Sequence, residues 1–132
     1  MNNDLKLKIE TKSSYLYPDA MIICGELAMS DIEKQAITNP RVVIEVLSKS
    51  TEGYDRGDKF SFYRLIPTLE YYILIEQNKA QVEVYKRGSK SNRFIWELTI
   101  TEGLDSVLSL ALSETETITI KLSDIYFKTQ FE

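Results

Sequence analysis

The chain has 132 residues and a mass of 15.3 kDa, so we expect a single domain over residues 1–132. It has no histidine and one cysteine, Cys24, which excludes a Ser-His-Asp triad, a Cys-His pair, a four-ligand zinc site and an intrachain disulfide. The apolar runs are much shorter than the ~20 residues of a membrane span, and residues 1–10 lack the apolar segment of a signal peptide. These features predict a reduced, cytoplasmic protein that does not enter a membrane.

The net charge of −4 is unevenly distributed along the chain. Residues 41–93 carry ten basic and seven acidic side chains, whereas residues 94–132 carry two basic and seven acidic ones. Ordinary solvated charge is the common explanation of such a balance. The alternative is a local basic patch that binds nucleic acid without catalysis, which is less usual in an acidic chain. Its cations would be Arg56, Lys59, Arg64, Lys86, Arg87 and Arg93.

The first predicted elements are strands. Residues 5–9 alternate between apolar and charged, the pattern of a half-exposed strand, and a polar turn follows at residues 11–14. Residues 15–24 are predicted as a strand interrupted by Pro18, and residues 25–40 as a loop with one helical turn at residues 31–35. Residues 41–47, RVVIEVL, are apolar on both faces, which predicts a central strand covered on both sides.

The second half is predicted to contain one long helix and a series of strands. Residues 48–54 form a polar loop, and the helical pattern of residues 55–66 ends at Pro67. Further strands are predicted at residues 70–76, 81–87, 93–99 and 117–122, with turns at 78–79 and 88–92 and a short last helix capped by Ser123-Asp124. The order predicts an α+β fold with a helix on one face of a sheet. Because few helices remain to cover the other face, we expect a second subunit there, and hence a homodimer.

Glu45 is anomalous because it lies in the middle of an apolar strand. Since strand faces alternate, it shares a side with Val43 and Leu47. A buried carboxylate costs several kcal/mol unless it is paired or binds a metal. Two interpretations remain open: a functional carboxylate, or a structural one paired with Arg or Lys or located at a strand end that reaches solvent.

Asp19 and Lys59 can join Glu45 in one site. Asp19 follows Pro18 at the start of an apolar strand, and it can converge with Glu45 if the two strands are neighbours. Two carboxylates without histidine suit Mg²⁺, which is usually held by one or two carboxylates and several waters. Lys59 lies on the helix face of Phe62, Tyr63 and Ile66, where its ammonium either reaches the carboxylates or extends into water.

Two strings of the chain carry a resemblance to a known family. They are YPDAMIICGE, from residue 17, and NPRVVIEVLSKSTEGYDRGDKFSFYRLIPTLEYYIL, from residue 39. In the order and spacing of Pro18-Asp19, Glu45 to Ser48, Tyr54 to Arg56 and Lys59, the chain resembles the Uma-two family of endonucleases, also catalogued as domain of unknown function 820. That family belongs to the PD-(D/E)XK, or restriction-endonuclease-like, superfamily.

The resemblance implies a restriction-endonuclease-like mixed sheet with an α/β-like core, and Mg²⁺- or Mn²⁺-dependent hydrolysis of DNA. It implies that Asp19 and Glu45 bind the metal and that Lys59 supplies the positive group of the catalytic set. Ser48, Arg56 and Arg64 are expected to contact the substrate.

The sequence departs from the family pattern at two points. The superfamily lysine usually lies two residues after the glutamate, where this chain has Leu47; Lys59 is the expected substitute and Lys49, in the following loop, the weaker one. Relatives also have an amino-terminal helical segment before the first strand, which we do not find here. Both departures favour the alternative to an enzyme: a non-catalytic, degenerate dimeric module of the same fold with a structural or regulatory role.

Overall fold

The computed structural model describes residues 6–9, 14–29, 36–50, 52–89, 91–129 and 131. Its centre is a mixed five-stranded sheet with the strand order β3-β4-β5-β6-β7. Only β4 and β5 run parallel; the other neighbours are antiparallel. The strands are β3 (Ala20–Ile22), β4 (Val42–Val46), β5 (Tyr71–Ile75), β6 (Gln81–Arg87) and β7 (Trp96–Glu102). The predicted α+β class and mixed sheet are confirmed.

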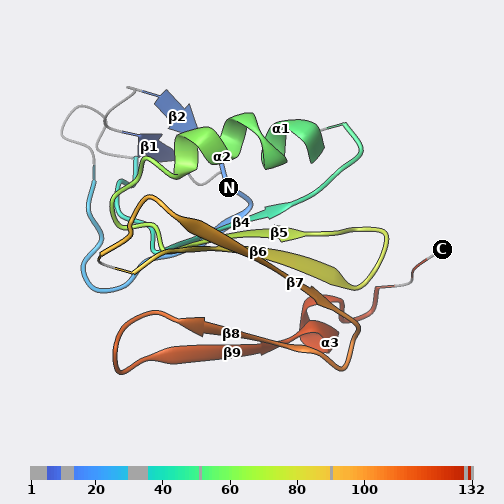
Figure 1. The fold of residues 1–132 in the computed structure, drawn as a ribbon. Coiled ribbons are helices and arrows are strands. Elements are labelled where there is room, and N and C mark those ends of the chain that lie inside the picture. Colours follow the sequence, from blue (N-terminus) through green and yellow to red (C-terminus); the bar gives the residue numbers. More distant parts are fainter. Residues whose placement is uncertain are drawn as a thin grey trace.

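One face of the sheet is covered by two helices and two short strands. These are α1 (Glu52–Arg56), α2 (Asp58–Tyr63), β1 (Leu7–Ile9) and β2 (Ser14–Leu16), which lie on the same side of the sheet in Figure 1. Leu7 and Leu16 from the strands and Tyr63 from α2 pack with Val43 and Tyr72 of the sheet in one buried cluster. This cluster forms the wall against which the predicted site is built.

The opposite face is covered by the carboxyl-terminal part of the same chain. The hairpin of β8 (Val107–Ala111) and β9 (Thr117–Lys121) and the short helix α3 (Leu122–Ile125) lie below the sheet in Figure 1. Leu108, Leu110 and Leu122 are buried there against Val42 and Ile73. The argument that a second subunit must cover the central strand is therefore wrong, because the chain supplies this layer itself.

The predicted and observed elements differ at several boundaries. Strand β8 was not predicted, although Leu108 and Leu110 are buried and Val107 and Ser109 are exposed, which is a period-two pattern. The predicted strand 15–24 is two strands in different sheets, and β7 begins three residues later than predicted because residues 93–94 lie in a turn. Lys8 is buried, not exposed as the alternation of residues 5–9 predicted. The predicted turns at residues 11–14 and 31–35 lie wholly or largely outside the described residues.

The predicted helix 55–66 begins earlier and is divided at Gly57 into α1 and α2. Gly57 has φ −106° and ψ −85°, which departs from helical geometry, and a Cβ there would lie 3.2 Å from the carbonyl oxygen of Gly53. The last turn of α2 tightens to i→i+3 hydrogen bonds before Pro67. Within the described chain, no helix has the length and apolar content required to cross a membrane.

We expect Leu110→Ala to lower the free energy of unfolding by about 2–5 kcal/mol, because the substitution leaves a cavity between the β8–β9 hairpin and the sheet. Leu104→Ala, at an exposed leucine, is the matched control and should change stability by less than about 0.5 kcal/mol. Urea unfolding measures both. An equal, small effect of the two substitutions would contradict a packed second layer.

Candidate active site

Glu45 is held at the carboxyl-terminal end of β4 with only 1% of its surface exposed. The predicted face is confirmed, since Val43 and Leu47 belong to the cluster under α2. Its Oε1 accepts a hydrogen bond from the backbone N–H of Asp19 at 2.9 Å. Its Oε2 accepts one from the Lys59 ammonium and lies 3.4 Å from the Tyr63 hydroxyl, which donates to it. The carboxylate is thus fixed from three directions.

Asp19 lies directly beside Glu45 because β3 and β4 are antiparallel neighbours. Ala20 is opposite Ile44 in the ladder, and continuing that register sets Asp19 opposite Glu45. The Asp19 Oδ2 accepts a hydrogen bond of 2.7 Å from the backbone N–H of Val46. The two acidic residues are therefore joined by reciprocal bonds. The Glu45 carboxylate accepts from the N–H of Asp19, and the Asp19 carboxylate accepts from the N–H of the residue after Glu45. Unlike Glu45, Asp19 is exposed.

Lys59, near the start of α2, bridges two buried carboxylates. Its Nζ contacts Glu45 Oε2 and lies 3.2 Å from Asp55 Oδ1, one helical turn earlier. Asp55 is 2% exposed, and the Tyr72 hydroxyl donates to its backbone oxygen at 2.8 Å. The Lys59 ammonium also lies 5.6 Å from the centre of the Tyr54 ring. Of the two alternatives for Lys59, the first therefore holds in part: its ammonium reaches Glu45, together with Asp55, rather than extending into water.

Burial and pairing shift the pKa values of this group. Burial raises the pKa of Glu45, and the bonds from Lys59 and the Asp19 N–H offset only part of that effect. Burial alone would lower the pKa of Lys59, but its bonds to Glu45 and Asp55 outweigh it and raise the pKa. Burial also raises the pKa of Tyr63, as does the neighbouring Glu45 charge, so its hydroxyl stays protonated and donates. The lysine is therefore charged and the phenol is a permanent donor.

The predicted substrate contacts are divided between the two ends of α2. Ser48 follows β4 directly, and its hydroxyl lies 3.2 Å from that of Ser50. Arg56 is engaged by two carboxylates: it pairs with Glu83 and, at 3.2 Å, with Glu76. Arg64 lies at the C-cap of α2, away from Lys59 and Glu45. The structure thus brings Ser48 to the end of β4 near Glu45 and leaves Arg64 at the other end of the helix.

Sequence reasoning missed two buried acidic residues, Asp55 and Glu83. Glu83 lies on the sheet face opposite to that of Val82 and Val84, so strand alternation could have assigned it to the side that α1 covers. Asp55 lies four residues before Lys59, which is the spacing of a helical ion pair, so the sequence carried a signal for this contact. Lys49, the weaker substitute, is exposed in the turn after β4.

The donor set fits a hard divalent cation. Within the described residues, no group of three or more acidic or cysteine side chains is placed to hold a metal ion, so a cation here would depend on the two carboxylates of Asp19 and Glu45. An exposed aspartate beside a buried, oriented glutamate suits a cation that keeps most of its waters, as Mg²⁺ does. Both residues would hold the ion through carboxylate oxygens.

Comparison with known proteins gives the family. Residues 1–121 match the family model Uma2, described as "Putative restriction endonuclease", and the chain belongs to this family. It is 42% identical over 96 residues to "Uncharacterized protein sll1609" and 34% identical over 112 residues to "Uncharacterized protein slr1290", both from Synechocystis sp.. These matches cover 73% and 85% of this chain but 54% and 57% of the relatives, so the chain spans about half their length.

A solved structure shares the fold. It is the crystal structure of a protein titled a "putative nuclease belonging to DUF820" from Anabaena variabilis, with a TM-score of 0.65 and 13% sequence identity. The match covers 93% of this chain and 65% of that one. The predicted resemblance to the Uma-two family is therefore confirmed, and the structural match supports the fold.

We expect Lys59→Met to lower the free energy of unfolding at pH 7 by about 3 kcal/mol, because Glu45 and Asp55 would be left buried without their cation. Adding Glu45→Gln should restore part of this loss, since the amide carries no charge. Urea unfolding of wild type, both single variants and the double variant measures the coupling. Strictly additive effects of the two substitutions would show that the pair is not coupled.

Proposed function

We propose that the protein is a metal-dependent endonuclease that hydrolyses phosphodiester bonds of DNA, with Asp19, Glu45 and Lys59 as its catalytic residues. The observation that carries this proposal is the reciprocal bonding of Asp19 and Glu45 with the Lys59 ammonium on the same carboxylate. Membership of the Uma2 family supports it.

Each side chain has a distinct part in this chemistry. Asp19 and Glu45 would hold Mg²⁺ or Mn²⁺, which when bound supplies a more acidic water and offsets negative charge on the phosphoryl oxygens. The Lys59 ammonium stabilises the charge that develops on the phosphate in the transition state. Asp55 also pairs with Lys59, so the ammonium keeps one partner if the glutamate turns toward a cation.

The other candidate function is the non-catalytic, degenerate module. One observation favours it: Lys59 and Tyr63 already satisfy Glu45 Oε2, as in a purely structural ion pair. Leu47, at the usual position of the superfamily lysine, is buried in the cluster under α2 and supplies no charge. Calorimetric titration with Mg²⁺ separates the two functions, because only the enzyme requires saturable binding that is lost in Asp19→Asn.

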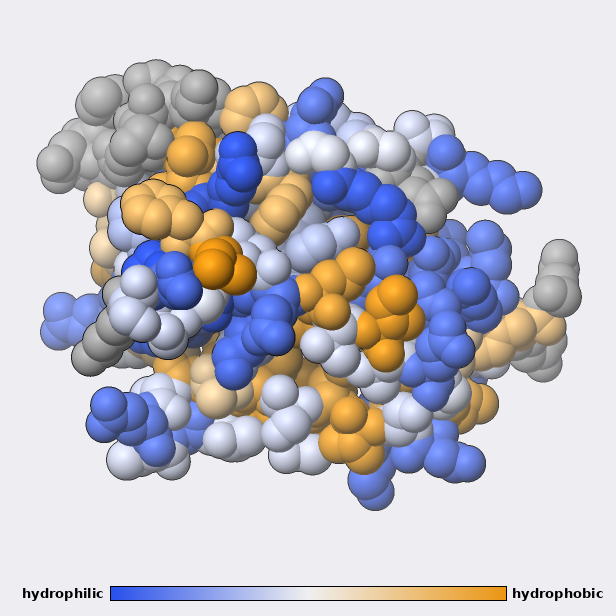
Figure 2. All heavy atoms as spheres, viewed as in Figure 1, coloured by the Kyte–Doolittle hydropathy of each residue, from blue (hydrophilic) through white to orange (hydrophobic). Residues whose placement is uncertain are grey.

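We also propose that the protein forms a homodimer in solution, through the free edge of β7. β7 pairs with β6 along one edge, and within the described residues no strand pairs with its other edge. Leu98 and Ile100 are 47% and 51% exposed. Figure 1 shows β7 at the front of the sheet, and Figure 2, in the same view, shows hydrophobic residues at the surface of this face. Long, apolar edges of this kind favour pairing with another chain.

The side chains of β7 are self-complementary about Thr99. Antiparallel pairing of two copies centred there sets Leu98 opposite Ile100 of the second copy, and Glu97 opposite Thr101. No like charges then lie directly opposite one another, and four aliphatic side chains gather on one face. The second copy therefore extends the sheet rather than covering it.

The nuclease proposal is tested on supercoiled plasmid with Mg²⁺ and then Mn²⁺. Wild type should nick the DNA, Glu45→Gln and Asp19→Asn should abolish nicking, and Lys59→Met should reduce its rate about 100-fold. Asp105→Asn and Glu114→Gln, at exposed acidic residues distant in sequence from the site, are the matched controls and should cleave as wild type does. A chelator should stop cleavage. Cleavage by Glu45→Gln at the wild-type rate would overturn the site assignment.

The dimer proposal is tested by sedimentation velocity over a range of protein concentrations. Wild type should sediment as a dimer, and Leu98→Lys should sediment as a monomer, because the new charges enter the apolar contact. Leu104→Lys, at an exposed leucine in the loop after β7, is the control and should remain dimeric. A wild-type monomer at all concentrations would exclude this interface.

A further inference from the structure

We propose that a basic pocket at the end of the sheet opposite to Asp19 and Glu45 binds a phosphate group. We call it the Arg41–Lys86 pocket. It is a cavity of about 840 Å³, within the range of small-ligand sites. Six of its ten lining residues are charged: Arg41, Glu70, Lys86, Arg87, Arg93 and Glu97. Four basic groups against two acidic ones give it a positive charge within a chain of net charge −4.

The register of the sheet separates this pocket from the catalytic pair. Arg41 precedes β4, Glu70 precedes β5, and Lys86 pairs with Tyr71 at that same end. Glu45, in contrast, lies near the far end of β4. Four residues of extended strand between Arg41 and Glu45 correspond to about 13 Å. The pocket is therefore distinct from the candidate active site.

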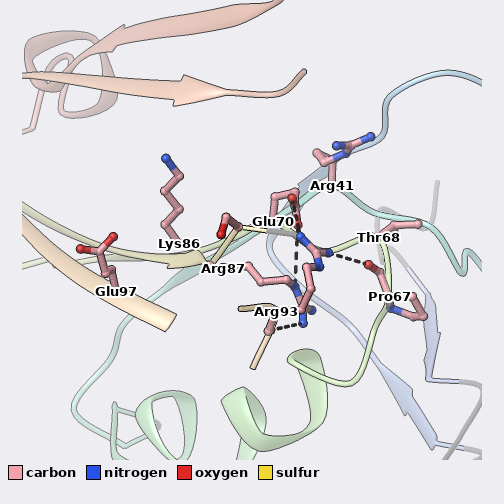
Figure 3. A pocket seen from close by; sticks show the side chains of 10 residues that line it. Arg41, Pro67, Thr68, Glu70, Lys86, Arg87, Arg93 and Glu97 are labelled. Carbon is pink, nitrogen blue, oxygen red and sulfur yellow. Dashed lines mark hydrogen bonds and ion pairs between the residues drawn. The ribbon is translucent and has the colours of Figure 1, made fainter. Parts of the chain in front are cut away.

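The floor of the pocket is a set of ion pairs and hydrogen bonds, of which Figure 3 shows those among Glu70, Arg87, Arg93 and Pro67. Arg87 donates to the backbone oxygens of Leu69, Ile66 and Arg64 at 2.6–3.0 Å, and its guanidinium lies 4.4 Å from the Trp96 ring. Arg93 pairs with Glu70 at 2.9 Å. Burial lowers the pKa of Arg87, and the charge of Arg93 lowers it further. Several bonds thus hold the floor together, although the charges of Arg87 and Arg93 repel each other.

Gly88 allows the backbone at Asn92 to approach closely at the edge of the pocket. A Cβ at this position would overlap the carbonyl oxygen of Asn92, so a side chain here would displace the loop that carries Arg93. The hydrogen bond from Gly88 N–H to the oxygen of Ile95 closes the same turn. Arg93 of the same loop donates to the backbone oxygen of Pro67 at 3.2 Å, which ties the loop to the segment after α2.

Two cations rise from the pocket with no acidic partner. Arg41 and Lys86 make no side-chain hydrogen bond or ion pair with any residue that the structure describes, and in Figure 3 they lie on either side of the Glu70–Arg93 pair. Glu97 is the cross-strand neighbour of Lys86, yet no ion pair joins the two side chains, which lie apart in Figure 3. The charges of Arg41 and Lys86 are therefore available to a ligand, whereas those of Arg87 and Arg93 are engaged.

A phosphate group is the ligand that this chemistry fits. A guanidinium matches two phosphate oxygens at once, and an ammonium adds a point charge that accepts any orientation. The charged lining is unsuited to an apolar molecule, and the volume exceeds that of one phosphate, which leaves room for the attached group. The phosphate can come from a nucleic-acid strand or from a free phosphorylated molecule of nucleotide size. The first source would extend the proposed function, while the second would be independent of it.

Trp96 provides the measurement, because it is the one tryptophan of the chain and its ring lies on the Arg87 guanidinium. Its fluorescence is followed during titration with inorganic phosphate, a nucleoside 5′-monophosphate and a short DNA strand without terminal phosphates. The titrations are done with a chelator and at constant ionic strength, so that neither metal binding nor cleavage contributes. We expect saturable binding of at least one probe.

The variant Arg41→Ala/Lys86→Ala should weaken that binding about tenfold or more, because two charged contacts are lost. Lys79→Ala/Lys121→Ala removes the same charge from exposed positions outside the pocket and should bind as wild type does. Thermal unfolding of both variants checks that they are folded. A pocket-dependent preference for the monophosphate supports the free molecule, and one for the strand supports nucleic acid.

Absence of saturable binding by all three probes would overturn the proposal. So would equal weakening in the two double variants, which would reflect general charge. Neither result bears on the nuclease proposal, since Asp19 and Glu45 are unchanged and no metal is present. Conversely, loss of cleavage in Glu45→Gln leaves phosphate binding in this pocket unaffected.

Discussion

The burial of one carboxylate, that of Glu45, organises the helical side of this molecule. An ionised carboxylate among Val43, Leu47 and Tyr63 is tolerated only if donors surround it. The three donors come from two separate segments: the backbone N–H of Asp19 before β3, and the Lys59 ammonium and Tyr63 hydroxyl of α2. Satisfying Glu45 therefore fixes how β3 and α2 are arranged on β4, and the same constraint creates the candidate site.

A second set of charges fixes α1 by the same principle. Arg56 reaches Glu83 and Glu76, while Lys59 reaches Glu45 and Asp55. The break at Gly57 separates the two helices that carry these cations, so each can meet a different strand of the sheet. Helix docking here combines apolar packing with ion pairs whose acidic partners are mostly buried. Such pairs are costly to break, which favours one arrangement over others.

The faces on which Glu45 and Lys59 lie were more predictable from sequence than the layer that covers the other side of the sheet. Strand alternation assigned Glu45 to the face of Val43, and helical spacing assigned Lys59 to the face of Tyr63, because both rules act over a few residues. Strand β8 was missed, and so was the packing of β8, β9 and α3 under the sheet, because its core contacts, such as Leu110 with Ile73, are distant in sequence. Lys8 in β1 shows the same limit. The alternation of apolar and charged residues predicted that Lys8 is exposed, but both faces of β1 are buried in the folded chain.

The basic side chains of residues 41–93 include two groups that differ in their interaction partners. The first group binds carboxylates or backbone oxygens within the protein and so stabilises the fold and the candidate site; it consists of Arg56, Lys59, Arg87 and Arg93. Arg41 and Lys86, which have no such partner within the described chain, stand over a cavity at the other end of the sheet. An acidic protein gains nothing in stability from two unpaired cations next to an arginine that Arg93 already repels. Their positions are accounted for if an anion completes the charge balance there.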